Sequence, residues 1–386
     1  MRWGTLAWAT GMLVGCATGG VGPSRFAPVA DHHQHLFSPD IVALLGDASG
    51  VSQLGADDLI PLLDSAGIRR AVVLSVAYMY GSPSRTVEDE FAKVRAENDW
   101  AAAQAARYPD RLIAFCGFNP LKDYALEELA RCAGDRRFGR GIKLHFGNSD
   151  VQLDEPAHLE RLRQVFRMAN EQGMAIVVHL RASISRKRPY GAAQARIFLE
   201  QLLPLAADVP VQVAHLAGTG PGYDDPPADS AMAVLAEAVA RGNRSTRRLF
   251  FDVTSVVDTG ISPANAALVA RRIRQVGIER VLFGSDAAVG ENLRPRESWA
   301  VFRRLALTDD EIEQLTGELA AIVDYAAEVS ALDTADVPPT AHPLPLVNVF
   351  RPDDPRPGLD RDEVLAQAPA TEDGQFRVPR ILGEGL

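Results

Sequence analysis

Short apolar runs that alternate with amphipathic stretches constrain this 386-residue chain more than any other feature. Eight such runs, rich in branched and aromatic residues, recur before residue 287. Because they are mostly apolar rather than alternating, they indicate strands covered on both faces, as in a parallel sheet. The expected strands are residues 26–31, 70–77, 111–117, 141–146, 174–180, 209–216, 249–255 and 280–286.

Helices are expected between these strands. Gly67, Gly173 and Gly277 stand just before three of the strands, where a glycine ends a helix in the left-handed conformation. Eight consecutive β/α units predict one (β/α)8 TIM barrel over residues 28–335, with an open doubly wound sheet as the alternative. The last expected helices are residues 296–305 and 309–329, the latter opened by a capping box that runs from Thr308 to Glu311.

The N-terminal residues resemble an export signal followed by a tether. Arg2 precedes an apolar stretch, residues 6–14, that is too short to cross a bilayer and ends just before Cys16. This pattern resembles a bacterial lipobox, whose cysteine receives a lipid. We expect a lipoprotein signal peptide over residues 1–15 and a tether over 16–27. The protein would then be exported to the periplasmic side and held at the outer membrane by its lipid alone; a buried N-terminal helix is the alternative.

The C-terminal residues differ in character from the barrel. Prolines recur from about residue 336, and each removes a backbone donor and restricts the residue before it. We therefore expect residues 336–386 to form an irregular extension without chemistry of its own.

Composition narrows the choice of partners. The net charge is −10 and no basic stripe is present, so nucleic acid is excluded as an expected partner and a small-molecule substrate is favoured. Of the three cysteines, Cys116 lies in an apolar run and is expected to be a core residue rather than half of a disulfide. The sequence leaves open whether the chain forms a homo-oligomer.

Histidines gather where the expected strands end. His33 and His35 follow the first strand, and residues two apart on a strand point the same way, so both imidazoles can reach one ion. His179 and His215 end strands five and six, and Asp286 ends strand eight. Because all these strand ends meet at one mouth of a barrel, the set predicts a site for zinc or another first-row divalent ion.

The ordered set of motifs resembles the amidohydrolase superfamily, in its amidohydrolase-related branch of metal-dependent TIM-barrel hydrolases and decarboxylases. The resemblance covers about residues 28–330. Its carriers are Asp31-His32-His33-Gln34-His35, Gly141-Ile142-Lys143-Leu144-His145, Val178-His179, Ala214-His215 and Leu282-Phe283-Gly284-Ser285-Asp286.

The resemblance implies a catalytic divalent metal, with Zn²⁺ as the first choice. His215 would ligate a second ion or polarise the substrate. Lys143 stands where binuclear relatives carry a carboxylated lysine that bridges two ions, so one ion and two ions are both open. The implied ligands of the first ion are His33, His35, His179 and Asp286.

Metal-assisted hydrolysis is the expected reaction. Asp286 would take a proton from water and return it to the leaving group, and His215 would help to polarise the carbonyl. Asp31 is expected either to anchor the histidines or to cap nearby backbone. A lactone, ester or cyclic amide would fit as substrate. A decarboxylase of aromatic or unsaturated acids and an inactive binding lipoprotein are the alternatives.

A basic loop after the fifth strand suggests an anionic substrate. Arg181 opens this loop and is expected to hold a carboxylate, with a solvated loop as the alternative. His145 shares the inward face of its strand with Lys143, and is expected to touch the substrate or to bond at the rim. Tyr78 and Tyr80 follow the second strand and are expected to line the pocket.

Overall fold

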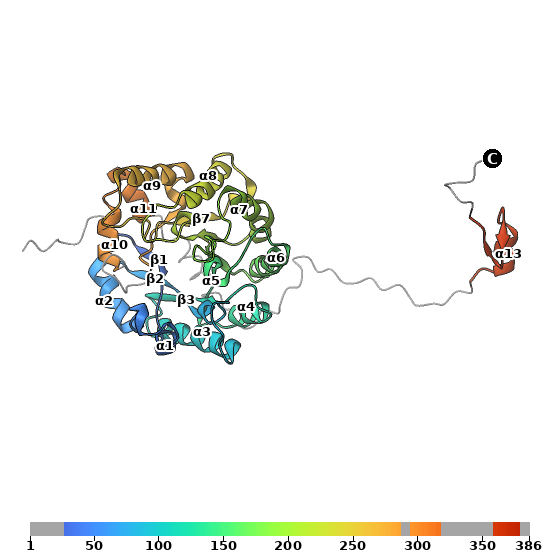
Figure 1. Cartoon of the computed structure of the whole chain (residues 1–386), viewed down its shortest axis with the longest axis horizontal. Helices are drawn as coiled ribbons and strands as arrows, with labels where there is room; N and C mark the ends of the chain where they lie inside the picture. The colour runs from blue at the N-terminus through green and yellow to red at the C-terminus, as the bar shows by residue number, and fades with distance from the viewer. Residues whose placement is uncertain (1–26, 287–293, 318–357, 379–386) are drawn as a thin grey trace, which may run out of the picture. The chain divides into compact units, whose positions relative to one another are not determined.

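Eight parallel strands form one sheet in sequence order, and a ring of helices surrounds it (Figure 1). The computed structural model describes residues 27–286, 294–317 and 358–378. The strands are β1 Ala30–Gln34, β2 Arg70–Leu74, β3 Leu112–Gly117, β4 Phe138–His145, β5 Ala175–His179, β6 Val211–Val213, β7 Leu249–Asp252 and β8 Val281–Leu282.

Hydrogen bonds between the first and last strands close the sheet into a barrel. The backbone N–H of His32 donates to the carbonyl of Phe283 at 2.9 Å, and that of Asp286 donates to the carbonyl of His33 at 2.8 Å. Gln34 and Asp286 also form a parallel bridge. The predicted closed α/β barrel is therefore confirmed, and the open sheet is excluded.

The first strand begins later than expected. We predicted residues 26–31, with the histidines after the strand, whereas β1 covers Ala30–Gln34 and runs through His32 and His33. The polar run forms a strand because its backbone pairs with β2 on one side and with the residues after β8 on the other. Tertiary pairing outweighs the local preference here.

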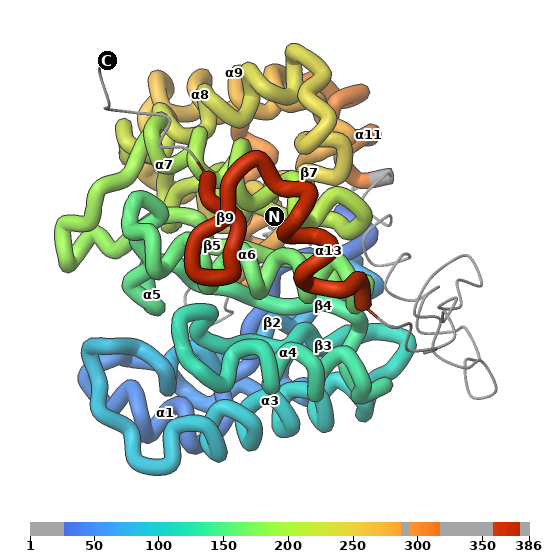
Figure 2. The backbone as a smooth tube through the Cα atoms, turned by 90° about the vertical axis from the view of Figure 1, so that its right-hand side faces the viewer, coloured from blue at the N-terminus to red at the C-terminus, as the bar shows by residue number. Residues whose placement is uncertain are grey.

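Helices cover the outside of the barrel, and α3 and α4 run side by side along one flank (Figures 1 and 2). Gly67 and Gly173 have φ of 75° and 63°, as expected for helix ends in the left-handed conformation. Gly277 also ends its helix, but its φ of 88° and ψ of 132° lie outside the left-handed helical region. The helices are α1 Pro39–Leu45, α2 Ala56–Ala66, α3 Glu90–Ala106, α4 Ala125–Gly134, α5 Phe146–Ser149, α6 Pro156–Glu171, α7 Ala192–Ile197, α8 Pro226–Ala240, α9 Pro263–Val276, α10 Pro295–Phe302 and α11 Asp309–Gly317.

The predicted capping box at the start of α11 is present. The backbone N–H of Thr308 donates to Glu311 Oε2 at 2.7 Å, and the N–H of Glu311 donates to Thr308 Oγ1 at 3.2 Å. Glu311 also pairs with Arg274 of α9, and Leu315 is 1% exposed. The helix α11 therefore packs on the barrel, and the rest of the expected helix to residue 329 lies outside the described residues.

Apolar side chains fill the barrel below its mouth. One buried cluster occupies the interior and a larger one lies between the strands and the helices. In the interior, a Cβ on Gly141 would lie 2.3 Å from the ring of Phe115, so the glycine makes room for this ring. The barrel is thus a packed support, and polar side chains gather at its mouth.

The expectation for Cys116 is wrong. Cys116 on β3 and Cys132 on α4 form a disulfide, with their Cα atoms 6.3 Å apart. Cys116 is also buried, as predicted. The pairing depends on which face of β3 the helix α4 covers, and the apolar run around Cys116 does not reveal that contact.

The C-terminal segment is not wholly irregular. The chain divides into compact units over residues 1–332 and 333–386, and the second contains the helix α13 Arg361–Ala366 and an antiparallel hairpin. Asp360 caps this helix. The hairpin joins β9 Thr371–Glu372 to β10 Gln375–Phe376 through Asp373 and Gly374, both with positive φ. The Asp-Gly pair was the sequence signal that the prolines obscured.

The predicted signal peptide, tether and lipidation site at Cys16 lie outside the described residues. Within the parts of the chain that the structure describes, no helix is both long and apolar enough to cross a bilayer.

Candidate metal centre

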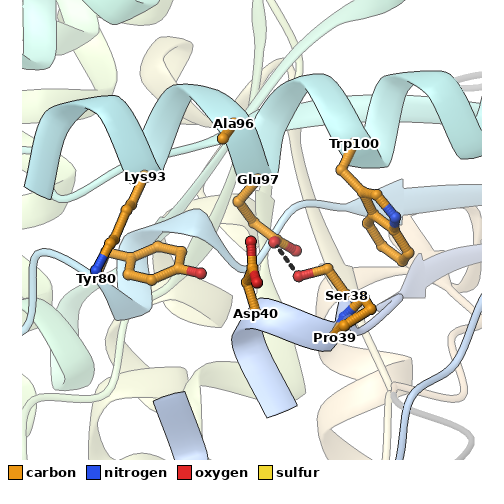
Figure 3. Close-up of a pocket in the computed structure, with 8 residues that line it drawn as sticks. All are labelled: Ser38, Pro39, Asp40, Tyr80, Lys93, Ala96, Glu97 and Trp100. Atoms are coloured by element: carbon orange, nitrogen blue, oxygen red, sulfur yellow. Dashed lines mark hydrogen bonds between the residues drawn. The ribbon is translucent and has the colours of Figure 1, made fainter. Parts of the chain in front are cut away.

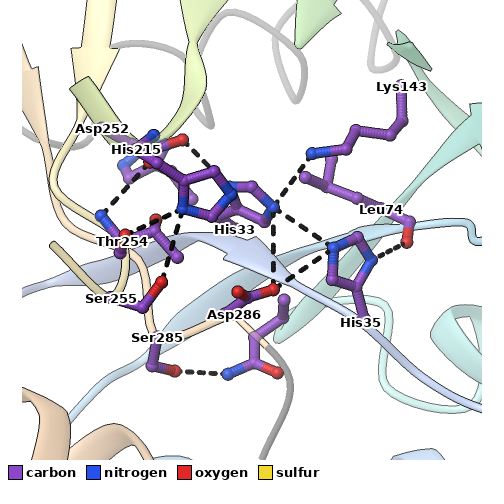
Figure 4. A network of polar contacts seen from close by, with 12 residues as sticks. His33, His35, Leu74, Lys143, His215, Asp252, Thr254, Ser255, Ser285 and Asp286 are labelled. Atoms are coloured by element: carbon purple, nitrogen blue, oxygen red, sulfur yellow. Dashed lines mark hydrogen bonds and ion pairs between the residues drawn. The ribbon is translucent and has the colours of Figure 1, made fainter. Parts of the chain in front are cut away.

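Three potential ligand atoms meet at the mouth of the barrel (Figure 4). The Nε2 atoms of His33 and His35 lie 3.2 Å apart. Asp286 Oδ1 lies 4.0 Å from the first of these atoms and 3.5 Å from the second. Both histidines are buried, whereas the Asp286 side chain is 24% exposed. The three side chains thus offer two nitrogens and one oxygen within 4.8 Å of one another.

Each of these imidazoles is held through its other nitrogen. His33 Nδ1 lies 3.0 Å from Asp252 Oδ2, and His35 Nδ1 lies 2.6 Å from the carbonyl oxygen of Leu74. Because both partners accept hydrogen bonds, each Nδ1 carries the proton and each Nε2 presents a lone pair. Burial lowers the pKa of His33 to about 4 and that of His35 to about 3, so both rings are neutral near pH 7.

Asp252 at the end of β7 organises this side of the site. Besides His33, it accepts hydrogen bonds from Gln212 Nε2 at 2.6 Å and from the backbone N–H of His215 at 2.8 Å. Burial opposes ionisation, but His33 and His215 together outweigh it and hold the pKa of Asp252 well below its usual range. Asp252 was not among the predicted site residues. Its signal was an acidic residue at the end of an otherwise apolar run.

The backbone of His215 has a conformation that is uncommon for residues other than glycine. His215 and Leu216 have φ of 55° and 46°, in the left-handed region. The hydrogen bond to Asp252 fixes this conformation, and His215 Nδ1 lies 2.8 Å from the carbonyl oxygen of Thr254. Such strain is frequent at functional sites, where the surroundings impose it.

A cavity of about 160 Å³ brings the predicted residues together. Two of the predicted substrate residues, His145 and Tyr78, are among those that line it. Their ring centroids lie 5.0 Å apart. The lining also includes all six predicted metal ligands, namely His33, His35, Lys143, His179, His215 and Asp286.

His179 and Lys143 do not belong to the cluster of ligand atoms formed by His33, His35 and Asp286. The ring of His179 stacks on that of His145, with centroids 3.9 Å apart, and it is not among the three side chains whose ligand atoms cluster. Lys143 Nζ lies 3.0 Å from His33 Nε2, and burial lowers the pKa of this amine to about 8. The roles of both residues as ligands stay predictions.

Arg181 pairs with an acidic residue of this chain, and its predicted role in holding a substrate carboxylate stays a prediction. Its guanidinium binds Asp225, with Nε 2.7 Å from Oδ2, and the described lining of the cavity does not include it. Arg186 and Arg188 of the same loop both pair with Asp150. Two acidic residues distant in sequence thus pair with the three arginines of the basic loop.

Asp31 caps backbone, which was one of its two expected roles. Its Oδ1 accepts the backbone N–H groups of His33 at 3.1 Å and Ser285 at 3.2 Å, and its Oδ2 accepts the hydroxyl of Ser285. It therefore ties β1 to the residues that follow β8. Tyr80, in contrast, does not line this cavity but a separate one.

The donor set fits a divalent ion. Two ligands that stand about 2 Å from one tetrahedral ion are about 3.3 Å apart. The 3.2 Å between the Nε2 atoms of His33 and His35 and the 3.5 Å from His35 to Asp286 are close to that spacing. Neutral imidazoles and a carboxylate are also the ligands that zinc takes in proteins.

Comparison with known proteins agrees with the geometry. The amidohydrolase family model matches residues 30–321. The 5-carboxyvanillate decarboxylase from Sphingomonas paucimobilis shares 17% identity at a TM-score of 0.53, over 77% of this chain and 98% of that one. A zinc-bound amidohydrolase from Burkholderia multivorans shares 16% identity at a TM-score of 0.52, over 78% and 99%. At these identities the two likenesses show the fold alone.

The C-terminal segment matches a different family. The model of the Glu-tRNAGln amidotransferase C subunit matches residues 307–378 and overlaps the barrel match at α11. The C subunit of the aspartyl/glutamyl-tRNA(Asn/Gln) amidotransferase of Kineococcus radiotolerans is 53% identical over 88 residues, which are 23% of this chain and 89% of that protein. The extension is therefore not the featureless tail that we expected. The chain belongs to the amidohydrolase family, whose metal-dependent enzymes are hydrolases or decarboxylases, and it carries at its C-terminal end a segment of the amidotransferase C-subunit family.

Proposed function

We propose that residues 30–321 form a metal-dependent hydrolase that cleaves a C–O or C–N bond of a lactone, ester or cyclic amide. The observation that carries this proposal is the convergence of His33 Nε2, His35 Nε2 and Asp286 Oδ1 at one mouth of the barrel. A divalent ion at this point, with zinc as the first choice, supplies Lewis-acid chemistry that activates water and polarises a carbonyl.

Asp286 is suited to move the proton. Burial raises the pKa of this carboxyl, but the facing imidazoles and Lys143 outweigh burial and lower it below its usual value. The carboxylate is thus ionised at neutral pH, and it reaches the cavity. It would take a proton from the attacking water and deliver it to the leaving oxygen or nitrogen.

The hydrogen bonds assign different tasks to His215 and His145. The carbonyl of Thr254 accepts a hydrogen bond from His215 Nδ1, and we therefore assign Nε2 the role of acceptor or ligand. His145 Nδ1 instead accepts the backbone N–H of Asn148 at 3.1 Å, so the proton of its neutral ring is on Nε2. We therefore assign polarisation of the carbonyl to His145, with the Tyr78 hydroxyl as a second donor, rather than to His215.

Decarboxylation of an aromatic acid is the second candidate, because the Sphingomonas decarboxylase has the same fold. A decarboxylase must hold the ring of its substrate while the carboxylate leaves. Lys143 is the one ammonium or guanidinium group in the described lining of the cavity, since Arg181 binds Asp225. This lining therefore offers little to anchor a polyanionic aromatic acid, which favours hydrolysis.

The test combines metal analysis with two product assays on the full chain. We expect at least one bound divalent ion per chain. We also expect hydrolysis of a lactone, ester or cyclic amide that stops after chelation and returns when metal is added back. The variant His33→Ala should lose both metal and turnover. Carbon dioxide release from aromatic acids without hydrolysis would establish the lyase instead. A protein that binds no divalent ion would overturn both candidates.

We further propose that the C-terminal segment serves as the C subunit of an aminoacyl-tRNA amidotransferase, as in the relatives that it resembles. Its identity to them supports this proposal, and so does its surface. Leu359, Phe376 and Val378 are 87%, 57% and 76% exposed, so these apolar side chains are available for contact with another protein chain. Copurification of the full chain with the other amidotransferase subunits would test it.

Export as a lipoprotein remains our proposal for location, and it conflicts with the second activity. A disulfide such as Cys116–Cys132 persists in an oxidising compartment, which favours export. Aminoacyl-tRNA is instead a cytoplasmic substrate. Labelling with a radioactive fatty acid, with Cys16→Ser as the control, distinguishes the two, because only the exported chain would carry the lipid.

A further inference from the structure

A second cavity, of about 340 Å³, lies between the helices α1 and α3 (Figure 3). One wall is a face of α3, whose lining residues recur at helical spacing, and the other is formed by Tyr80 and the first residues of α1. None of the residues that line it also lines the metal cavity. The lining residues are Ser38, Pro39, Asp40, Tyr80, Lys93, Ala96, Glu97 and Trp100.

Two short segments separate this cavity from the metal centre. Phe37 faces the metal cavity, and its neighbour Ser38 faces the second one. Tyr78 likewise lines the metal cavity, whereas Tyr80 lines the second one. The second cavity is therefore a distinct place in the fold that the proposed reaction does not use.

Glu97, which lines this cavity, carries an unsatisfied oxygen. Its side chain is 3% exposed, and Oε2 accepts the hydroxyl of Ser38 at 2.5 Å. Glu97 Oε1 has no hydrogen-bond partner although it is buried. A buried acceptor without a donor is energetically unfavourable, and most native structures avoid it. This oxygen therefore indicates a missing donor.

The surroundings define the chemistry of that donor. In Figure 3 the carboxylate of Asp40 lies beside that of Glu97, with Tyr80 on one side and Trp100 on the other. Burial and the nearby Asp40 raise the pKa of Glu97 to about 7, and Ser38 opposes this rise. Two adjacent carboxylates attract a cation, and aromatic faces favour an organic one. Lys93 also lines the cavity but is exposed to water.

We propose that this cavity binds a small primary ammonium ion with an apolar substituent. The ammonium group donates to Glu97 Oε1 and lies beside Asp40, while the substituent packs against Trp100 and Pro39. A metal ion fits less well, because the clusters of three potential ligands among the described residues lie elsewhere and aromatic rings supply no ligand.

Calorimetric titration of the full chain with benzylammonium at pH 8 tests the proposal, because Glu97 is then ionised. We expect saturable binding of one equivalent. Glu97→Gln should weaken it about tenfold or more, since a charge-assisted hydrogen bond is lost while the shape is kept. Asp40→Asn, at an exposed position, should weaken it less. Glu127→Gln, an exposed carboxylate on the neighbouring α4, should leave the affinity unchanged.

Three results would overturn the proposal. The first is equal affinity of the wild type and Glu97→Gln for benzylammonium, and the second is no binding to the wild type. The third is binding of Ca²⁺ alone that displaces the amine, which would make the cavity a metal site. Tetramethylammonium, which has no N–H donor, should bind at least about tenfold more weakly than benzylammonium. Should Glu97→Gln fail to fold, the comparison of these two cations and Asp40→Asn still decide the matter.

Discussion

The barrel and the C-terminal segment resemble their relatives in opposite ways. The barrel shares 17% identity with a decarboxylase of the same fold, whereas the segment shares 53% with the C subunit of an amidotransferase. The two parts also differ in how many of their side chains are buried. Each barrel strand is mostly buried, but no residue of the described range 358–378 is buried.

This difference indicates which kinds of position each part shares with its relatives. A barrel with its own core accepts many apolar substitutions that keep volume and pattern, so few residues besides the ligands need be shared. The described part of the C-terminal segment, residues 358–378, contains no buried residue. We therefore attribute its identity to these relatives to the proposed contact with a partner rather than to a core of its own. Each substitution predicted below should therefore change the properties of one part and leave those of the other unchanged.

Asp286→Asn should have the largest effect. Without its charge the side chain neither takes the proton from water nor supplies an anionic ligand, so kcat/KM should fall by about 10²–10⁴-fold. Assembly with amidotransferase subunits should be unchanged. Turnover and copurification, measured on one preparation, check both halves of the prediction. Full turnover in the variant would remove Asp286 from the mechanism.

Cys116→Ser combined with Cys132→Ser should destabilise the barrel. The disulfide joins residues 16 apart, and a loop of that size contributes about 3 kcal/mol to the free energy of unfolding. Urea denaturation of the barrel measures the change. The wild type under reductant should match the double variant, and identical curves with and without reductant would show that the pair does not form in solution.

Asp252→Asn should act on the site without touching the substrate. The variant loses the charge that orients His33 and Gln212, so metal affinity or turnover should fall by about 10–100-fold. Competition with a chelator measures the affinity. Glu237→Gln, an exposed carboxylate paired with Arg241, is the matched control and should behave as the wild type. Equal metal affinity and turnover in Asp252→Asn and in this control would argue against the orienting role.

Phe376→Ser should have the smallest effect, and only on the C-terminal segment. Loss of one aromatic contact should weaken assembly by about 1 kcal/mol or more, while hydrolysis stays at the wild-type rate. Gln375→Ser, on the opposite face of the same strand, is the control. If both variants copurify equally well with the amidotransferase subunits, Phe376 does not contact the partner.

Much of the barrel could be predicted because its signals are local and repeated. Apolar runs, helix-ending glycines such as Gly67, and the capping box at Thr308 depend on neighbouring residues, and all three were confirmed. The start of β1 was wrong because pairing with distant strands decides it. The hairpin at Asp373 was missed because the prolines upstream suggested that the whole extension is irregular.

The sequence by itself determined the fold class and that the six predicted metal ligands lie at one mouth of the barrel, because strand order and the two-residue period place the strand ends together. Only the tertiary structure decided how those side chains are used. In it, Arg181 pairs with Asp225, Asp252 binds His33 Nδ1, and Cys116 forms a disulfide with Cys132. Each of these contacts links residues that are 16 to 219 positions apart, so their existence depends on how elements pack and not on any local pattern.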